Sequence, residues 1–409
     1  MSAQVIRQHS YQQGKPRGVT QEQKVDHILL LTIIALMTLG LVMVASASIA
    51  IAERKTEVPL YYFYRQLTYA GIGLLLALIV INIPLRFWER FGAPIFVFGL
   101  LSLAIILIPG VGHAVNGSTR WINFGLFNVQ PSEFVKLFVI IYLSGYLMRR
   151  GEEVRNEARG FLKPMALLII TALLLLMQPD FGTTVVIFAT ALGMMFLAGV
   201  RLMHFALLIV LCGLAVTALV IDSPYRLERL TAFMNPWADP FNSGFQLTQA
   251  LIAFGRGEWL GVGLGSGIQK LFYLPEAHTD FLFAVLAEEL GMLGALTVLL
   301  LFVCFMWRVF LIARRADLLG KPFEMYLAYG IGLWVGMQAF INLGVNMGVL
   351  PTKGLTLPFM SYGGSSVLAT SLAVAILLRV DMELRGWPAD AKKKGSQRDF
   401  KRSRARRKK

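Results

Sequence analysis

Ten long runs of apolar residues, separated by polar or charged stretches, dominate this chain. Of its 409 residues, 56% are hydrophobic and only 15% are charged, a composition far from that of a soluble domain. About 20 apolar residues in a helix span the hydrocarbon core of a bilayer, and a helix satisfies its own backbone polar groups there. We therefore expect an all-α polytopic membrane protein. The predicted transmembrane helices lie near 27–50, 64–82, 92–109, 132–149, 163–178, 182–199, 203–221, 281–306, 323–347 and 364–385.

The basic residues predict how this bundle is oriented. The first apolar run, from Ile28 to Ala50, is longer than the roughly 7–15 apolar residues of a signal peptide, so we expect an uncleaved helix. With the N-terminus in the cytoplasm, most of the 39 Lys and Arg residues fall in cytoplasmic segments, as the positive-inside rule requires. Both termini are then cytoplasmic, and 27–385 forms one transmembrane domain in the cytoplasmic membrane.

The two ends of the chain, 1–26 and 386–409, lack apolar periodicity, and we predict that both are disordered cytoplasmic tails. The largest block of positive charge, in a chain of net charge +15, lies in the C-terminal tail beside the inner leaflet. We therefore expect this tail to contact anionic lipid or a cytosolic partner, and we expect no binding of nucleic acid.

Three external segments are longer than a minimal connection: 109–131, 222–280 and 348–363. The largest joins the seventh and eighth predicted helices. Long ordered loops tend to carry function, so the functional site is expected on this side. A packed lid without substrate contact is the alternative interpretation of 222–280.

Several common chemistries are excluded by residue spacing. The glycines from Gly255 to Gly267 match neither a P-loop nor GxGxxG, so we interpret them as flexible or closely packed backbone. The five histidines form no HExxH pattern, and Ser365 lacks the GxSxG context of serine hydrolases. Cys212 and Cys304 both lie in apolar runs, which argues against a disulfide between external loops. No organic cofactor is expected.

Charged residues gather at the outer ends of the predicted helices. Asp280 stands at the head of an apolar run, and Arg120 lies in the first long external loop. Glu133 and Lys136 are three residues apart, on one face of the fourth helix. Asp180 lies in the turn between the fifth and sixth helices. Ionisable groups near hydrocarbon are costly and usually functional, so we expect these side chains to converge on a polar cavity that opens outward.

Each of these residues also has a purely structural interpretation. Asp280 could simply cap its helix, since Asp is a favoured N-cap. Glu133 and Lys136 could neutralise each other within the membrane. Asp180 could belong to ordinary turn chemistry.

Two further carboxylates lie deeper in the bundle. Glu288 is about 12 Å further along the helix that follows Asp280, and Glu289 is its neighbour. Because two adjacent carboxylates within a span cannot both face lipid, we expect one of them to face the bundle or a cavity.

Five strings of this chain resemble motifs of the SEDS family of shape, elongation, division and sporulation proteins. The strings are Asn116-Gly-Ser-Thr-Arg-Trp-Ile122, Gln130-Pro-Ser-Glu-Phe-Val-Lys136, Gln178-Pro-Asp-Phe-Gly-Thr183, Leu274-Pro-Glu-Ala-His-Thr-Asp-Phe281 and Pro358-Phe-Met-Ser-Tyr-Gly-Gly-Ser-Ser366. The resemblance covers 27–385, in order and with ten helices. The Pro-Glu-Ala before His-Thr-Asp and the N-terminal extension resemble the cell-division branch of the family rather than its elongation branch.

The resemblance implies a peptidoglycan glycosyltransferase that polymerises lipid II at the outer face of the cytoplasmic membrane, for the cell wall of the septum. In that family the aspartate that matches Asp280 is the essential catalytic residue. The polyprenyl diphosphate is a good leaving group, so one carboxylate acting as a general base suffices. Asp280 is then expected to take the proton of the GlcNAc 4-hydroxyl of lipid II as it attacks the undecaprenyl diphosphate-linked glycan.

Positive charge is expected to meet the departing diphosphate. Arg120, Lys136 and Lys353 are the external candidates, and Arg256 is a further one. Lys136 could instead lower the pKa of Asp280 and hold this carboxylate ionised.

A divalent cation remains open, because Asp280, Glu133 and Asp180 could bind one but show no diagnostic spacing. The predicted set of substrate-binding or supporting residues is completed by the deeper Glu288 and by four residues of the motif strings: His278, Thr279, Ser361 and Ser365.

The resemblance also implies a protein partner. Family members work with a class B penicillin-binding protein, here of the FtsI type, which cross-links the glycan. The division proteins FtsQ, FtsL, FtsB and FtsN are expected near that pair at the septum.

Two other functions remain open: a lipid II flippase and a non-catalytic scaffold of the division machinery. A flippase needs polar groups along its whole path, whereas most of the charges singled out here lie at the outer end. A scaffold would tolerate Asp280→Asn, and a flippase would move lipid II without joining sugars.

Overall fold

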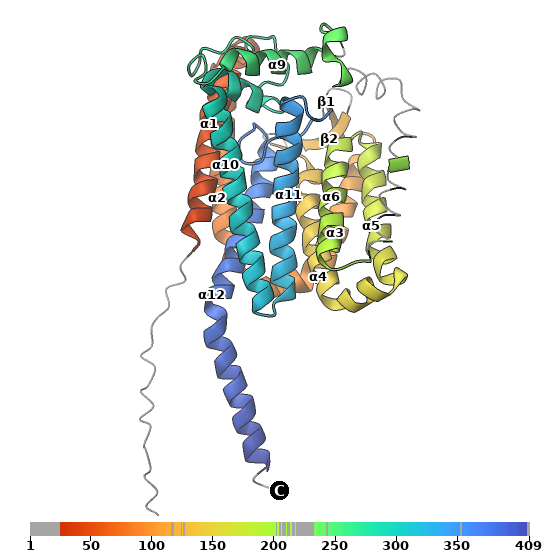
Figure 1. Cartoon of the computed structure of the whole chain (residues 1–409). Coiled ribbons are helices and arrows are strands. Elements are labelled where there is room, and N and C mark those ends of the chain that lie inside the picture. The colour runs from red at the N-terminus through yellow and green to blue at the C-terminus, as the bar shows by residue number, and fades with distance from the viewer. Residues whose placement is uncertain are drawn as a thin grey trace, which may run out of the picture.

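The computed structural model describes residues 25–115, 118–123, 125, 127–201, 203, 206, 210, 213–214, 217, 233–242, 244–351 and 354–406. Long helices run side by side through the molecule (Figure 1). They are α1 (His27–Thr56), α2 (Tyr61–Val80), α3 (Leu85–Ile106), α4 (Pro131–Asn156), α5 (Ala158–Met177), α6 (Phe181–Leu197), α10 (Leu282–Leu318), α11 (Pro322–Asn346) and α12 (Gly364–Arg406). The shorter η1 (Pro236–Ala238) and α9 (Phe245–Gly257) precede α10.

The predicted transmembrane helices are largely confirmed. Every predicted span except 203–221 coincides with a helix, and 203–221 lies largely outside the described residues. Within the described residues, seven helices are long and apolar enough to cross a membrane, and α6 is a shorter apolar helix. The chain is therefore a polytopic helical membrane protein.

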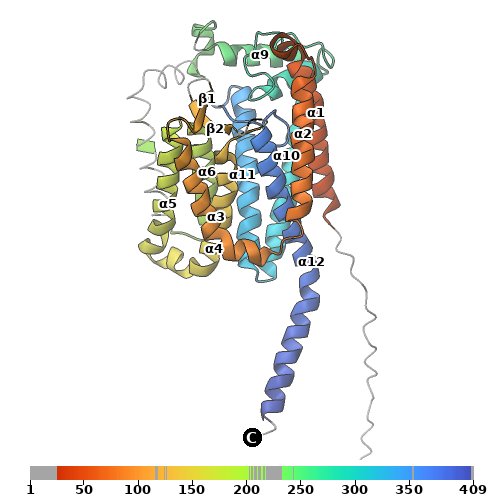
Figure 2. The same ribbon diagram turned by 180° about the vertical axis from the view of Figure 1, so that it is seen from behind.

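The two ends of the bundle differ. α1 begins and α12 ends at the same end, here called the terminal end, whereas α9 and a small sheet lie at the opposite end, here called the loop end (Figures 1 and 2). Residues 1–24 lie outside the described residues. α12 continues as a helix to Arg406, which differs from the disorder expected for 386–409. An existing helix removes the cost of nucleation, and the Ala, Lys and Arg of this segment favour helix.

α4 and α11 form the centre of the bundle. In their apolar stretches 78% and 67% of the residues are buried, against 22% in α2, so α2 belongs to the periphery and presents most of its surface to lipid. α11 packs against α4, α6 and α10. A side chain at Gly330 of α11 would bring its Cβ within 2.5 Å of Ile140 in α4. Small residues allow this close approach of membrane helices.

The loop 109–131 folds into a three-stranded antiparallel sheet that the sequence analysis did not predict. Its strands are β1 (Gly112–Val115), β2 (Ser118–Asn123) and β3 (Asn128–Val129), in the order β1-β2-β3. The sheet places Arg120 and Trp121 of β2 at the loop end, beside the first turn of α4.

α10 is interrupted near its start, although one continuous span was predicted. Gly291 adopts φ 66° and ψ −165°, which breaks the helix. The segment 258–263 forms hydrogen bonds with the backbone on either side of this break. Val262 N donates to Glu288 O at 3.0 Å, and Met292 N donates to Glu258 O at 2.8 Å. The glycine-rich segment therefore folds back against α10, as closely packed backbone.

Candidate functional site

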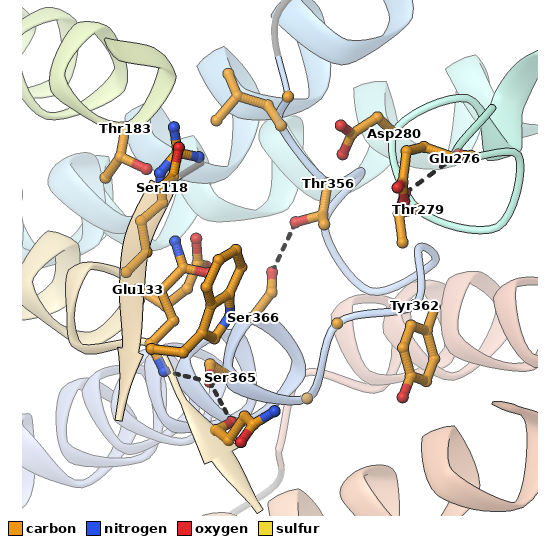
Figure 3. Close-up of a pocket in the computed structure, with 18 of the residues that line it drawn as sticks. Ser118, Glu133, Thr183, Glu276, Thr279, Asp280, Thr356, Tyr362, Ser365 and Ser366 are labelled. Atoms are coloured by element: carbon orange, nitrogen blue, oxygen red, sulfur yellow. Dashed lines mark hydrogen bonds between the residues drawn. The ribbon is translucent and has the colours of Figure 1, made fainter. Parts of the chain in front are cut away.

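A cavity of about 810 Å³ opens at the loop end of the bundle. Its wall is built by α2, the sheet, the start of α4, the segment before α10, the loop 354–363 and the start of α12 (Figure 3). α9 contributes Gln246, so the loop 222–280 reaches the cavity. The charged and hydroxyl-bearing side chains of the wall are Arg65, Tyr69, Ser118, Arg120, Glu133, Thr183, Glu276, Thr279, Asp280, Thr356, Tyr362, Ser365 and Ser366.

Asp280 faces this cavity from the segment just before α10. Its backbone carbonyl accepts hydrogen bonds from Asn342 and Asn346 of α11, at 2.9 Å each. Its carboxylate accepts no hydrogen bond from the described part of the chain, and Phe281 rather than Asp280 is the N-cap of α10. The structural alternative of a capping aspartate is therefore wrong, and the carboxylate is free to meet a ligand.

The surroundings of Asp280 favour its protonated form. Burial and, to a lesser extent, the nearby carboxylate of Glu276 together raise the pKa of Asp280 to about 7, against the opposing effect of the Arg120 guanidinium. The prediction that Lys136 lowers the pKa of Asp280 is wrong. A carboxyl group of this kind is poised to exchange a proton near neutral pH.

Lys136 is committed to partners inside the bundle. Its Nζ lies 2.9 Å from both carboxylate oxygens of Glu133 and 2.8 Å from Oε1 of Gln338, and it stands 5.2 Å from the centre of the Trp334 ring. Only Glu133 of this pair lines the cavity. The structural pair considered for these residues is confirmed. The position of Lys136 does not favour the predicted contact with a diphosphate, because its charge is neutralised away from the cavity.

Arg120 and Asp180 join the sheet to the turn between α5 and α6. Asp180 is the N-cap of α6, where it accepts from Thr183 N at 3.3 Å, and it also accepts from Ser132 Oγ at 3.1 Å. Arg120 lies 3.9 Å from the Asp180 carboxylate and donates to the carbonyl of Gln178 at 3.1 Å. Asp180 has the predicted turn chemistry and anchors Arg120, whose guanidinium remains partly exposed.

Thr279 and Ser365 line the cavity as expected. Thr279 donates to the carboxylate of Glu276 at 2.9 Å. Ser365 Oγ accepts from Gln130 N at 2.9 Å and so ties the start of α12 to the start of α4.

His278 and Ser361 belong to the supporting structure and not to the cavity wall. The imidazole of His278 packs against the rings of Tyr62 and Tyr362, with centroids 4.6 and 5.5 Å apart. Burial lowers the pKa of His278 to about 4, so this ring is neutral at pH 7. Ser361 Oγ accepts from Leu357 N at 2.9 Å and closes a turn of the loop 354–363.

Glu288 is buried beneath the folded-back segment and away from the cavity. It accepts from the backbone N–H groups of Ile268 and Gln269 at 2.9 and 3.1 Å, and Arg256 lies 3.4 Å from it. Arg256 does not line the cavity either. Both residues therefore hold the segment before Asp280, so Glu288 has the supporting one of its two predicted roles, and neither residue lies where it could contact a ligand in the cavity.

Glu289 has a similar structural role. Its carboxylate contacts Lys270 Nζ at 2.5 Å and Ser46 Oγ at 2.7 Å. Neither deep carboxylate faces the cavity. Lys353 lies outside the described residues. Within the described residues, no group of three or more His, Cys, Asp or Glu side chains is arranged to hold a metal ion.

Arg65 and Tyr362 were missed by the sequence analysis. Arg65 of α2 lines the cavity and donates to the hydroxyls of Tyr61 and Tyr69 at 2.9 and 3.0 Å. A lone arginine within a predicted span was the available signal. Burial raises the pKa of Tyr362 to about 12, so this lining residue presents a neutral hydroxyl.

Taken together, these features define a polytopic membrane protein with a charged cavity at one end of its helical bundle. Its cavity holds one carboxyl group of perturbed pKa beside two arginines. The chain belongs to the cell cycle protein family of FtsW, RodA and SpoVE, whose model matches residues 26–386. The resemblance to the SEDS family is thereby confirmed.

Relatives in this family cover nearly the whole chain. A protein of Nitrosococcus halophilus (strain Nc4) named probable peptidoglycan glycosyltransferase FtsW is 61% identical over 360 residues, which cover 88% of this chain and 93% of the relative. A protein of the same name from Allochromatium vinosum is 54% identical over 374 residues, which cover 91% and 94%.

Solved structures share the fold. A chain from a structure described as structural coordination of polymerization and crosslinking by a peptidoglycan synthase complex matches with a TM-score of 0.73 and 28% identity, over 88% of this chain and 98% of that one. The rod shape determining protein RodA of Thermus thermophilus matches with a TM-score of 0.64 and 27% identity, over 88% and 97%.

Proposed function

We propose that this chain is a peptidoglycan glycosyltransferase that polymerises lipid II into glycan strands during synthesis of the septal wall, with Asp280 as its general base. The observation that carries the proposal is the unpaired carboxylate of Asp280 in a polar cavity, with a pKa of about 7. A general base works best when its pKa lies near the working pH. The names of the relatives, probable peptidoglycan glycosyltransferase FtsW, support the same activity.

The reaction needs one proton acceptor. The 4-hydroxyl oxygen of the acceptor GlcNAc attacks the anomeric carbon of the lipid-linked strand, and its proton passes to Asp280. The bond from that carbon to the diphosphate oxygen breaks, and undecaprenyl diphosphate leaves with the electron pair. A single displacement of this kind inverts the anomeric carbon.

Two arginines supply positive charge for the diphosphate. Arg120 from β2 and Arg65 from α2 line the cavity together with Asp280. Arginine binds phosphate oxygens through several N–H groups in a fixed plane. Positive charge placed where the leaving group gains negative charge lowers the barrier to its departure. A divalent cation that shares this role is a further proposal, and two of its three expected ligands, Asp280 and Glu133, line the cavity.

The loop end is proposed to face outward from the cytoplasmic membrane at the division site, and the terminal end to face the cytoplasm. The basic residues of the chain support this orientation, and the cavity lies at the loop end. A penicillin-binding protein of the FtsI type is the proposed partner, because the chain of the peptidoglycan synthase complex matches 88% of this chain. FtsQ, FtsL, FtsB and FtsN are proposed neighbours, and the basic tail is proposed to contact anionic lipid.

The deep carboxylates do not favour transport of lipid II. Glu288 and Glu289 were the features that suggested a polar path through the bundle. Both carboxylates are occupied by the segment 265–270, through backbone N–H groups and Lys270. The charged residues that line the cavity lie at the loop end, which supports a reaction at that end rather than a transport path through the bundle.

The direct test is polymerisation of lipid II by the purified chain together with its penicillin-binding partner, whose transpeptidase is inactivated. Asp280→Asn keeps the size of the side chain and removes its basicity. We expect at least about a 100-fold loss of glycan, since general base catalysis contributes roughly 100-fold to 10,000-fold. Unchanged glycan ladders from Asp280→Asn would rule out this role, and movement of lipid II between leaflets without glycan would indicate a flippase.

A further inference from the structure

One face of α11 carries three amide side chains at four-residue intervals. They are Gln338, Asn342 and Asn346, here called the amide ladder, and at most 2% of each is exposed. Residues four apart lie one above another on a helix. Buried amides in a membrane protein are costly unless their donors and acceptors are used. The bonds of the ladder therefore identify what it holds in place.

Asn342 and Asn346, the two members of the ladder nearest the end of α11, hold the backbone around Asp280. Asn342 Nδ2 and Asn346 Nδ2 both donate to the carbonyl oxygen of Asp280, at 2.9 Å each. Asn346 Oδ1 accepts from Ala284 N at 3.0 Å, within the first turn of α10. The chain is thus fixed at Asp280 and again four residues later.

The same face holds the opposite wall of the cavity. Asn342 Nδ2 also donates to the carbonyl of Leu355 at 2.6 Å, and Gln338 Nε2 donates to the carbonyl of Thr356 at 2.9 Å. This wall lies against the carboxylate: a Cβ placed on Gly354 would be 3.1 Å from Oδ2 of Asp280. Asn342 therefore bonds to both sides of the narrow gap in which the Asp280 carboxylate stands.

Gln338, the first residue of the ladder along the chain, connects it to the buried ion pair of Glu133 and Lys136. Gln338 Oε1 accepts from Lys136 Nζ at 2.8 Å and from Trp334 Nε1 at 2.9 Å. Lys136 in turn binds Glu133, which lines the far side of the cavity from Asp280 (Figure 3). Hydrogen bonds joined through the backbone of Leu355 and Thr356 therefore connect Glu133 to Asp280 behind the cavity wall.

We propose that the amide ladder is a positioning device for the catalytic carboxylate, because it fixes Asp280 and the loop 354–357 to a single face of α11. The inference rests on the proposed function, in which Asp280 is the base. Asn342 and Asn346 do not line the cavity, so they act through Asp280 and not on the substrate. A small misplacement of a reacting group costs much of the rate, while substrate binding by the rest of the cavity is retained.

The test uses Asn342→Leu and Asn346→Leu in the full chain with its partner. Leucine is close to asparagine in size and donates no hydrogen bond. Asn342→Leu removes the bonds to both walls and should lower kcat by roughly 10-fold to 100-fold, with KM changed by less than about twofold. Asn346→Leu leaves the Asn342 bonds in place and should lower kcat less.

A second readout distinguishes positioning from a general loss of structure. Glu276 from its own segment and Arg120 from β2 are the charged groups that shift the pKa of Asp280, and Arg65 of α2 and Glu133 of α4 line the same cavity. A displaced carboxylate changes its distances to both, so the acid limb of the pH profile should shift in Asn342→Leu. Thr171→Val is the matched control: Thr171 is buried in α5 and, among the described residues, bonds only within its own helix, to Leu167 O at 2.8 Å.

Rates are measured on the monodisperse, folded fraction, so that loss of protein does not count as loss of catalysis. Native kcat and an unmoved acid limb in folded Asn342→Leu would overturn the inference. Should that variant not fold, a native kcat and pH profile of Asn346→Leu would overturn it instead. Failure of the native chain to make glycan is a different result, because it would contradict the proposed function itself.

Discussion

Asp280 is half ionised near neutral pH, because burial and Glu276 raise its pKa to about 7. A general base acts only in its deprotonated form. Glycan synthesis should therefore be maximal above pH 7 and fall about tenfold for each pH unit below it. Initial rates at limiting lipid II, from about pH 5 to about pH 9, measure this limb.

Arg120 gives the pH profile an internal check. Its guanidinium opposes the rise in the pKa of Asp280, so Arg120→Gln should move the acid limb to higher pH as well as weaken substrate binding. A rate that stays constant through pH 7, or a limb that moves to lower pH in Arg120→Gln, would be inconsistent with Asp280 as the base.

At the residue scale, the sequence predicted the charged motifs but not the partner of each charge. Asp280, Arg120 and Glu133 were correctly expected in one cavity. Lys136 was expected to meet a diphosphate, but its spacing of three residues from Glu133 fits an ion pair equally well. The sequence alone does not distinguish a paired lysine from an unpaired one. Arg65 was missed because it opens an otherwise apolar run, and its role depends on α2 lying beside α12.

At the scale of single elements, the folded-back segment before Asp280 depends on glycines. Gly257 ends α9 against α10, and a Cβ placed there would lie 1.9 Å from Ala287 O. Gly257→Ala should therefore destabilise the protein by about 1–3 kcal/mol and lower activity, because the segment that carries Asp280 must move. Thermal unfolding in detergent measures the stability of the purified protein.

Gly255 is the matched control for this substitution. It lies in the same helix, and a Cβ placed on it meets nothing within 4 Å. Gly255→Ala should leave stability unchanged or raise it by up to about 1 kcal/mol, because alanine favours helix. Equal unfolding temperatures for the two alanine variants would show that the close approach at Gly257 has no energetic consequence.

The glycine pattern was interpreted correctly as flexible or closely packed backbone, but what it packs against could not be predicted. The interruption of α10 at Gly291 was not predicted, because a single glycine within a predicted span does not reveal a positive φ. Hydropathy reports burial and not the local backbone, so a broken helix and a continuous one look alike. The backbone contacts of 258–263 exist only after α9 and α10 meet.

At the scale of the whole molecule, a cluster of ion pairs closes the terminal end. Asp26, the N-cap of α1, bonds to Arg308 of α10 and lies 3.8 Å from Arg385 of α12. Asp381 of α12 binds Arg315 and Arg385 at 3.0 and 2.7 Å. Three helices that are distant in sequence are thus tied together at the terminal end of the bundle.

Removing one charge of the Asp26–Arg308 pair should destabilise the protein more than removing both charges together. Asp26→Asn keeps a good N-cap and removes the charge, and Arg308→Met removes its partner. Each single variant should lower the unfolding temperature, and the double variant should be less destabilised than the sum, with a coupling of roughly 0.5–3 kcal/mol. Additive effects in this double-mutant cycle would show that Asp26 and Arg308 do not stabilise each other.

The whole fold was the most predictable level. Long apolar runs predicted nine helices that the described residues contain, because membrane thickness fixes their length. The sheet in 112–129 and the helical extension of α12 were not predicted, since neither is determined by hydrophobicity. The cavity itself depends on how the outer ends of α2, α4 and α12 converge, which only the packed bundle defines.

α12 has a property that its two ends reveal together. Gly364, Ser365 and Ser366 in its first turn line the cavity, while Asp381 in the same helix belongs to the ion-pair cluster at the terminal end. The part of α12 from Gly364 to Asp381, about 26 Å long at 1.5 Å per residue, therefore joins the cavity wall to the terminal end of the bundle. A substitution at the ion-pair cluster is therefore made on the same helix that supplies part of the cavity wall.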